Sequence, residues 1–249
     1  MIFSTLLTFF MGHLLGDFYF QSAALAVQKD HSIPRLLQHS LIYLISMVGV
    51  TLPVFGSSLI LPAFGISVGH LIIDGSKFLL VQKGLLKPIQ EAVIYLVDQL
   101  LHGLVIIGVT VYLMESSLSI KYLPETTHFL RLLNGDITVL LSWVLILLLI
   151  VQPCSITIKK VLNHYRPRNE AVVEEDGLPN AGALIGVFER IFILLMLSAN
   201  QFTAIGFVLT AKSIARYNKI SESPQFAEYY LLGTLLSTLL IVISYFIIF

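Results

Sequence analysis

Residues 137–158 read ITVLLSWVLILLLIVQPCSITI, an apolar run without a charged residue that stops at Lys159 and Lys160. A helix of about 20 such residues spans the hydrocarbon core of a bilayer, because each residue adds about 1.5 Å. The run therefore predicts a transmembrane helix, and its length is the criterion for finding further spans in the chain.

The composition of the whole chain agrees with this interpretation. Of 249 residues, 56% are hydrophobic and only 12% are charged, against about 25% charged in an ordinary soluble domain. The charges cancel, with 15 Lys and Arg against 15 Asp and Glu. This balance excludes an ordinary cytosolic enzyme, a disordered chain and a nucleic-acid binder that works through bulk positive charge. The single cysteine, Cys154, excludes an internal disulfide and a thiolate metal cage.

The same length criterion identifies further apolar segments on both sides of this run. The predicted fold class is all-α, a polytopic transmembrane helix bundle with about eight spans. The predicted spans are residues 2–21, 36–55, 57–80, 89–113, 137–158, 181–199, 201–218 and 229–249.

The basic residues orient these spans. The connections after even-numbered spans hold only Lys121 and Arg131. Because cytoplasmic loops are enriched in Lys and Arg, the odd-numbered connections are predicted to be cytoplasmic and both termini to be outside. Those connections contain twelve of the 15 basic residues, Lys29, Arg35, Lys77, Lys83, Lys87, Lys159, Lys160, Arg166, Arg168, Lys212, Arg216 and Lys219.

The connections also predict a domain organisation. Residues 1–113 form a four-span unit rich in His and Asp, and residues 114–136 form an external loop with a short interfacial helix at 127–133. Residues 137–249 form a four-span C-terminal unit that includes a cytoplasmic linker at 161–180.

Ionisable side chains recur in the first four spans in a common pattern. Three His/Asp pairs are spaced i,i+4, which places both side chains of each pair on one helix face. Charged groups at bilayer depth cost several kcal/mol, so each needs a partner or a function. The pairs are His13 and Asp17, His70 and Asp74, and Asp98 and His102, and His39 in the second span completes the set.

Four imidazoles and three carboxylates without thiols are the donor set of Zn, Mn or Fe. Seven ligands are too many for one tetrahedral ion and would suit two ions bridged by a carboxylate, so we expect one or two divalent ions as cofactor. Two alternatives stay open for this set of residues, namely a metal-free proton or ion relay and purely structural pairing.

Neighbours of the set suggest further roles. Lys77 and Gln21 are the candidate catalytic residues, with Lys77 placed to bind an anionic group that enters from the headgroup layer. The alternative for Lys77 is a snorkelling anchor at the membrane surface. Gly12 and Gly16, like Gly65 and Gly69, have the small-xxx-small spacing that permits close helix contact.

The second half holds fewer buried charges. Glu189 and Arg190 fall inside the sixth predicted span, and Lys212 and Arg216 form an i,i+4 pair in the seventh. We expect Glu189 to face Lys212 or Arg216 as a structural ion pair, with a substrate-headgroup site as the alternative.

Several of these motifs together resemble a known family. They are HLLGDFYFQ at 13–21, then Lys29, His39, the HxxxD of His70 and Asp74 with Lys77, and the DQxxH of Asp98, Gln99 and His102. In order and spacing they resemble the bacterial membrane family catalogued as domain of unknown function 3307, over residues 1–113. The resemblance implies a multi-pass protein of a bacterial cytoplasmic (inner) membrane. More loosely, the bundle is similar to inner-membrane metal-dependent hydrolases.

These features predict a membrane-embedded metal-dependent hydrolase. Its expected substrate is a lipid-linked or amphiphilic phosphoester reached from the cytoplasmic leaflet, and its expected partner is therefore a membrane lipid and not a nucleic acid. A homo-oligomer stays open. The alternatives are a divalent-cation or proton-coupled transporter and a membrane scaffold or signalling partner in which metal staples the helices together.

Overall fold

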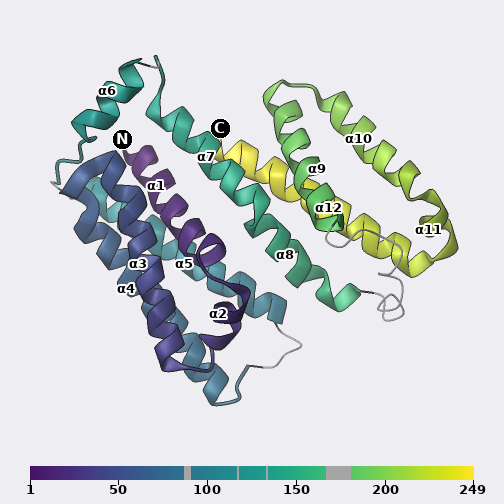
Figure 1. Ribbon diagram of the computed structural model, residues 1–249, viewed down its shortest axis with the longest axis horizontal. Coiled ribbons are helices and arrows are strands. Elements are labelled where there is room, and N and C mark those ends of the chain that lie inside the picture. The colour runs from purple at the N-terminus through teal and green to yellow at the C-terminus, as the bar shows by residue number, and fades with distance from the viewer. Residues whose placement is uncertain (87–90, 117, 133, 167–180) are drawn as a thin grey trace. The chain divides into compact units, whose positions relative to one another are not determined.

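The computed structural model describes residues 1–86, 91–116, 118–132, 134–166 and 181–249 (Figure 1). These residues form helices joined by short connections, with no strand among them. The all-helical prediction is therefore confirmed. Two compact units divide the chain, Met1–Leu148 and Leu149–Phe249.

The first unit is built around four long helical segments. Helix α1 (Ile2–Leu14) continues into a π-helix, η1 (Leu15–Tyr19), and short α2 (Ala23–Gln28) follows. Helices α3 (Ile33–Phe55) and α4 (Ile60–Gln82) pack against each other across the 3₁₀ turn η2 (Gly56–Leu59), and α5 (Glu91–Glu115) packs on α1 and α4. Helices α6 (Pro124–Leu132) and α7 (Ile137–Val151) complete the order.

The turn between α3 and α4 has a simple chemical cause. Gly56 has φ +62°, a left-handed conformation that side-chain-bearing residues rarely adopt. It ends α3, and α4 then returns alongside it.

One end of the first unit is a dry apolar layer. Phe9, Met47, Ile66 and Ile106 are each no more than 1% exposed and belong to one cluster of buried hydrophobic side chains. Hydroxyls near this layer bond to their own helix backbone four residues earlier, as Thr51 does to Met47 and Thr110 to Ile106. The two hydroxyls are therefore used within their own helices, and the side chains that form the layer are apolar.

The second unit is also helical. It contains α8 (Pro153–Leu162), η4 (Asn163–Tyr165), α9 (Ala181–Ser198), α10 (Phe202–Ala215), α11 (Tyr217–Glu222) and α12 (Pro224–Ile248). Helix α12 packs on α8 and α9, and α9 also contacts α10. Most of the predicted linker, residues 167–180, lies outside the described residues.

Within the part of the chain that the structure describes, six segments are long and apolar enough to cross a membrane. One of them, Ile33–Gln82, includes both α3 and α4, each about 34 Å long at 1.5 Å per residue. Helix α10 has only 14 residues, which is short for a span. A membrane protein with a helical bundle is supported, whereas the count of eight spans and the outside termini stay predictions.

Three predicted spans differ from the observed helices. The run at 137–158 lies within one candidate span, Ile137–Tyr165, but its helix changes from α7 to α8 at Pro153, which has no backbone N–H to continue α7. The run at 201–218 ends as α10 at Ala215, and residues 89 and 90 of the fourth predicted span lie outside the described residues. The short helix expected at 127–133 is present as α6.

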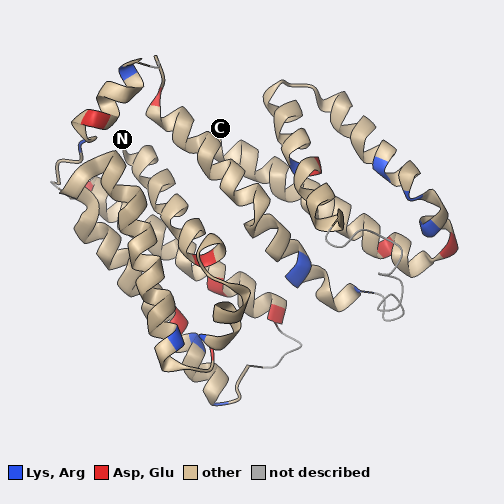
Figure 2. Ribbon diagram, viewed as in Figure 1, with Lys and Arg blue, Asp and Glu red and all other residues tan. Residues whose placement is uncertain are grey.

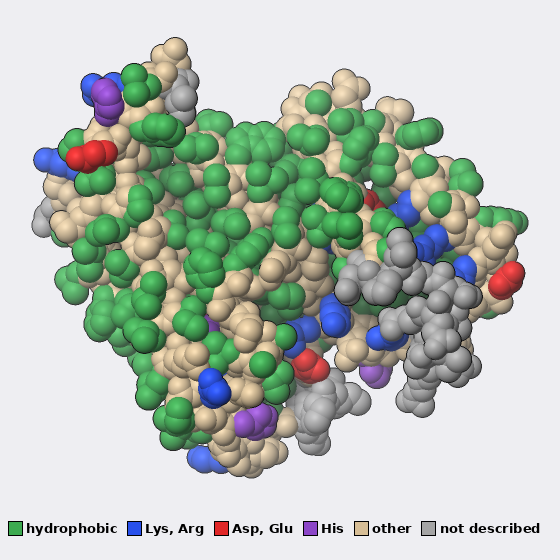
Figure 3. All heavy atoms as spheres, viewed as in Figure 1, with side chains coloured by type: hydrophobic (Ala, Val, Ile, Leu, Met, Phe, Trp, Pro, Cys, Tyr) green, Lys and Arg blue, Asp and Glu red, His purple; other side chains and the backbone are tan. Residues whose placement is uncertain are grey.

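The surface of each unit is rich in hydrophobic side chains, drawn green in Figure 3. Helix α5 alone exposes Leu100, Leu104, Ile107 and Val111 by more than 40% each. Exposed apolar area on this scale is typical of contact with lipid.

Candidate metal centre

All seven residues of the predicted set converge inside the first unit. Each is at most 9% exposed, and they come from four helical segments, α1 with η1, α3, α4 and α5. In Figure 2 several acidic and basic positions of the first unit lie close together in the part of that unit where α2 lies. The members are His13, Asp17, His39, His70, Asp74, Asp98 and His102, and we call them the His/Asp cluster.

Close helix packing makes this convergence possible. A Cβ on Gly16 would lie 2.8 Å from the Tyr43 ring and 3.1 Å from its Cα, and a Cβ on Gly12 would lie 2.8 Å from Met47 Sδ. Only glycine lets η1 and α1 approach α3 so closely. The packing prediction is confirmed for Gly12, Gly16 and Gly69 but is wrong for Gly65, whose Cβ would meet nothing within 4 Å.

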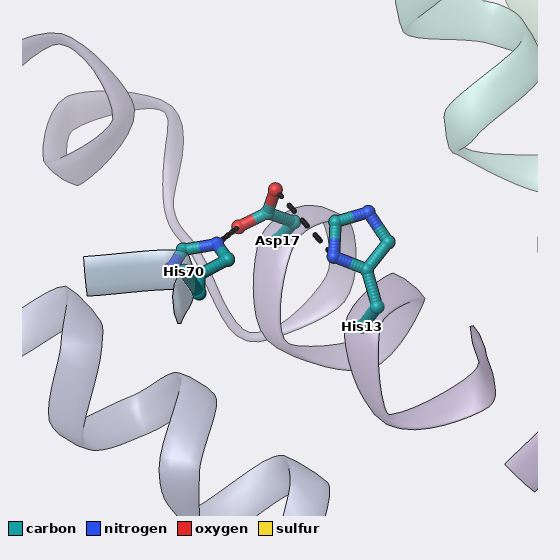
Figure 4. Close-up of side chains that lie close together, drawn as sticks. All are labelled: His13, Asp17 and His70. Atoms are coloured by element: carbon teal, nitrogen blue, oxygen red, sulfur yellow. Dashed lines mark hydrogen bonds and ion pairs between the residues drawn. The ribbon is translucent and has the colours of Figure 1, made fainter. Parts of the chain in front are cut away.

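The carboxylate of Asp17 is held from three sides. His70 Nε2 donates to its Oδ1 at 2.9 Å, and Gln99 Nε2 donates to its Oδ2 at 3.2 Å. His39 Nε2 lies 3.1 Å from Oδ1. In Figure 4 Asp17 lies between His13 and His70, although His13 Nδ1 is 4.0 Å away. Asp17 is carried by the π-helix, an irregularity often found at functional sites.

His13 is already hydrogen-bonded at both ring nitrogens. Its Nε2 donates to Gln99 Oε1 at 3.2 Å, which leaves Nδ1 to accept from the Tyr43 hydroxyl at 3.3 Å. The ring is therefore fixed by its neighbours, and through Gln99 it is linked to Asp17.

The carboxylate of Asp74 has two dissimilar oxygens. Oδ2 accepts a hydrogen bond from Lys29 Nζ at 2.8 Å and lies 3.3 Å from His39 Nε2. Oδ1 lies 3.7 Å from His102 Nε2 and has no hydrogen-bond partner within the described residues. His102 Nε2 lacks one as well and lies 3.7 Å from Asp98 Oδ2.

The spacing of these three donors suits a metal ion better than hydrogen bonds. A nitrogen–oxygen pair at 3.7 Å is too far apart for a hydrogen bond. Two ligands bound tetrahedrally to one ion at 2.0–2.1 Å are separated by about 3.4 Å. Asp74, Asp98 and His102 form one of three groups among the described residues that could hold an ion, and in this group Asp74 offers the oxygen that no hydrogen bond occupies.

The other two groups have competing contacts. Within the group His13, Asp17 and His70, the bonds described above already engage His13 and Asp17. In the group His39, His70 and Asp74, the oxygen nearest His39 is the one that Lys29 holds. Asp74 belongs to two groups, as a bridging carboxylate would, and the oxygen and nitrogen donors suit Zn, Mn or Fe.

Lys29 is a cluster residue that the sequence did not assign to the site. It follows α2, is 5% exposed and forms an ion pair with Asp74. Burial acts to lower the pKa of Lys29, but the carboxylates of Asp17 and Asp74 outweigh burial, and the net pKa lies above its usual range. The polar sequence between the first two predicted spans predicted only a connecting loop, and not that this loop turns back into the bundle.

The two predicted catalytic residues lie elsewhere. Lys77 Nζ is 3.2 Å from Asp30 Oδ2, and both side chains are 21% exposed. Gln21 is half-buried, and its Oε1 has no hydrogen-bond partner in the described part of the chain. Their catalytic roles stay predictions.

Buried charges in the second unit are matched within the chain. The guanidinium of Arg190 donates to the backbone carbonyls of Ile150 and Val151 and to Ser155 Oγ, next to the helix break at Pro153. Glu189 forms an ion pair with Lys212, as expected. The substrate-headgroup site, which was the alternative for these residues, stays untested.

Comparison with known proteins gives one match. The family model described as protein of unknown function (DUF3307) matches residues 5–130. No curated protein and no solved structure matches the chain. The match includes every residue of the His/Asp cluster and ends before the second unit.

Proposed function

The chain belongs to the DUF3307 family of proteins of unknown function, and we propose that it is a membrane-embedded, metal-dependent hydrolase. Its proposed substrate is a lipid-linked or amphiphilic phosphoester that enters from the cytoplasmic leaflet. The observation that carries the proposal is the group Asp74, Asp98 and His102, whose donors are buried and spaced for a metal ion.

The residues of the cluster divide into roles. Asp74, Asp98 and His102 would hold the ion, which would supply a Lewis acid to polarise the phosphoryl group and to lower the pKa of a water molecule. Hydrolysis joins the water oxygen to phosphorus, breaks the ester P–O bond and delivers a proton to the leaving oxygen. His39 Nε2, 3.1 Å from Asp17 Oδ1 and 3.3 Å from Asp74 Oδ2, carries a proton between these two carboxylates. It is placed to give that proton to the leaving oxygen, and the proton released by the water would then replace it.

The apolar layer favours an enzyme over a transporter. A conduit needs polar groups on both sides of its site, and buried Phe9, Met47, Ile66 and Ile106 lie on one side of the cluster. The hydroxyls nearby are bonded to their own helices. A pocket closed at one end fits a substrate that enters and leaves by the same route.

Metal analysis of the purified chain tests the proposal. We expect Zn, Mn or Fe to co-purify with the wild type, and Asp74→Asn to lose most of it because one ligand oxygen becomes an amide nitrogen. Release of inorganic phosphate from phosphatidic acid in mixed micelles should fall with the metal content. The matched control is Glu189→Gln, the same kind of change at a buried acid of the second unit, which should keep both.

Two outcomes would contradict the proposal. One is a wild-type protein that binds none of these metals even after reconstitution, which would favour the proton relay or structural pairing. The other is full metal content in Asp74→Asn. Bound metal without turnover on any phosphoester lipid would favour the scaffold.

A further inference from the structure

The ammonium group of Lys29 occupies a position that a second metal ion would need. Its Nζ donates to Asp74 Oδ2 at 2.8 Å. The same oxygen is 3.3 Å from His39 Nε2 and 3.8 Å from His70 Nδ1, the donors of a second candidate ion group. A lysine at hydrogen-bond distance and a divalent ion cannot both contact that oxygen from the same side.

The charges of the cluster also favour one metal ion over two. Three buried carboxylates face one buried lysine, and metal-binding imidazoles are neutral. One divalent ion brings the sum to zero, whereas two ions beside Lys29 would leave an excess of two positive charges. Uncompensated charge inside a bilayer costs several kcal/mol, so binding of a single ion is favoured.

The loop that delivers Lys29 is anchored at several points. Ser22 Oγ accepts from the Leu25 backbone N–H at the start of α2, and the Leu25 side chain is buried. After Lys29, Asp30 pairs with Lys77 and the His31 carbonyl accepts from Gln82. These contacts tie the loop to α4, so Lys29 is a fixed member of the site.

We propose that the cluster takes a single divalent cation, at Asp74, Asp98 and His102, with Lys29 as the second fixed cation of the site. This inference rests on the proposed function. An ammonium group has three N–H donors, and within the described residues one of them is used, on Asp74. The remaining donors face an anionic oxygen of the substrate, and a lysine binds phosphate as a point charge.

The number of ions bound by each variant tests this inference. Purified wild type and Lys29→Met are titrated with Zn²⁺ against a competing chelator, and bound metal per chain is measured by mass spectrometry. We expect one ion in the wild type. Lys29→Met should take a second ion or bind the first at least about tenfold more tightly, because one positive charge is gone.

Two further variants separate charge from folding. Lys83→Met removes an exposed lysine at the end of α4, and it should bind like the wild type. Lys29→Arg keeps the charge and should hold one ion with unchanged affinity. If Lys29→Met does not fold, the wild-type stoichiometry still decides the question.

The contrary outcomes are distinct. Two ions in the wild type, or a folded Lys29→Met with one ion and no gain in affinity, would overturn the role of Lys29 and leave the hydrolase proposal standing. A wild type that binds no ion would overturn both.

Discussion

The two units of this protein treat buried charge in different ways. In the described part of the second unit both buried charged side chains have a partner supplied by the chain, with Glu189 on Lys212 and Arg190 on backbone carbonyls and Ser155, although Glu189 Oε1 accepts no hydrogen bond there. In the first unit three carboxylates share one lysine, and polar atoms of His39, Asp74 and His102 lack hydrogen bonds within the described residues. A buried carboxylate that has its own cation needs no function beyond structure, whereas an excess of negative charge needs a further cation.

This difference makes opposite predictions for similar substitutions. Where the charges are matched, removing one side chain should cost stability. Where carboxylates are in excess, adding a cation or removing a carboxylate should increase it.

The largest effect is expected when the matched pair of the second unit is broken. Lys212→Met leaves Glu189, which is 6% exposed, without its cation. Removing one partner of a buried pair costs about 3 kcal/mol or more. Thermal unfolding in detergent should therefore show a clearly lower midpoint for Lys212→Met than for the wild type.

The double variant Glu189→Gln with Lys212→Met is the control for this prediction. It removes both charges, so most of the lost stability should return. An equally unstable double variant would mean that Lys212 acts through its packing over the Tyr230 ring, 5.3 Å from Nζ to the ring centroid, and the comparison between the units would fail on this side.

A somewhat smaller effect is expected from metal on the first unit. An ion that binds only the folded state stabilises it by about 2.7 kcal/mol at a concentration of one hundred times its Kd. The unfolding midpoint of the wild type should rise with Zn²⁺ or Mn²⁺ and fall with a chelator. His102→Ala should lose the response, whereas the double variant of the second unit should keep it.

A rise in midpoint that is equal in wild type and His102→Ala would contradict the assignment. It would place the ion outside the group Asp74, Asp98 and His102. Retention of the response in His13→Ala would sharpen the assignment further, since both ring nitrogens of His13 are hydrogen-bonded.

The sequence predicted the fold class and the members of the His/Asp cluster for simple physical reasons. Apolar runs have a length set by the bilayer, and i,i+4 spacing puts His70 and Asp74 on one face whatever the tertiary structure. Lys29 and Lys77 could not be distinguished in this way, because their partners depend on the path of the loop through α2. The sequence did contain a signal for the change of helix inside 137–158, namely Pro153. The prediction missed it because it used only the length of the apolar run.

The hydrogen-bond pattern within the cluster could not be predicted from the sequence either. Nothing in the spacing tells which oxygen of Asp74 meets Lys29 and which faces His102. Likewise, the π-helical turn η1 positions Asp17 against His39 and His70, and the spacing does not indicate it. The sequence therefore identified the ligand set but not its division into roles.

The smallest and most discriminating effect is expected from Asp98→Asn in protein stripped of metal. Asp98 is 8% exposed, and its Oδ2 lies 3.7 Å from His102 and 3.4 Å from Gln99 Nε2. An amide fills the same space without the charge, so the excess of negative charge falls and the metal-free protein should gain about 1 kcal/mol. The same variant should gain less stability than the wild type from added metal, because a ligand is lost.

If Asp98→Asn instead lowers the stability of the metal-free protein, the carboxylate is already matched by the chain, as Glu189 is. The first unit would then resemble the second, and its cluster would need no ion.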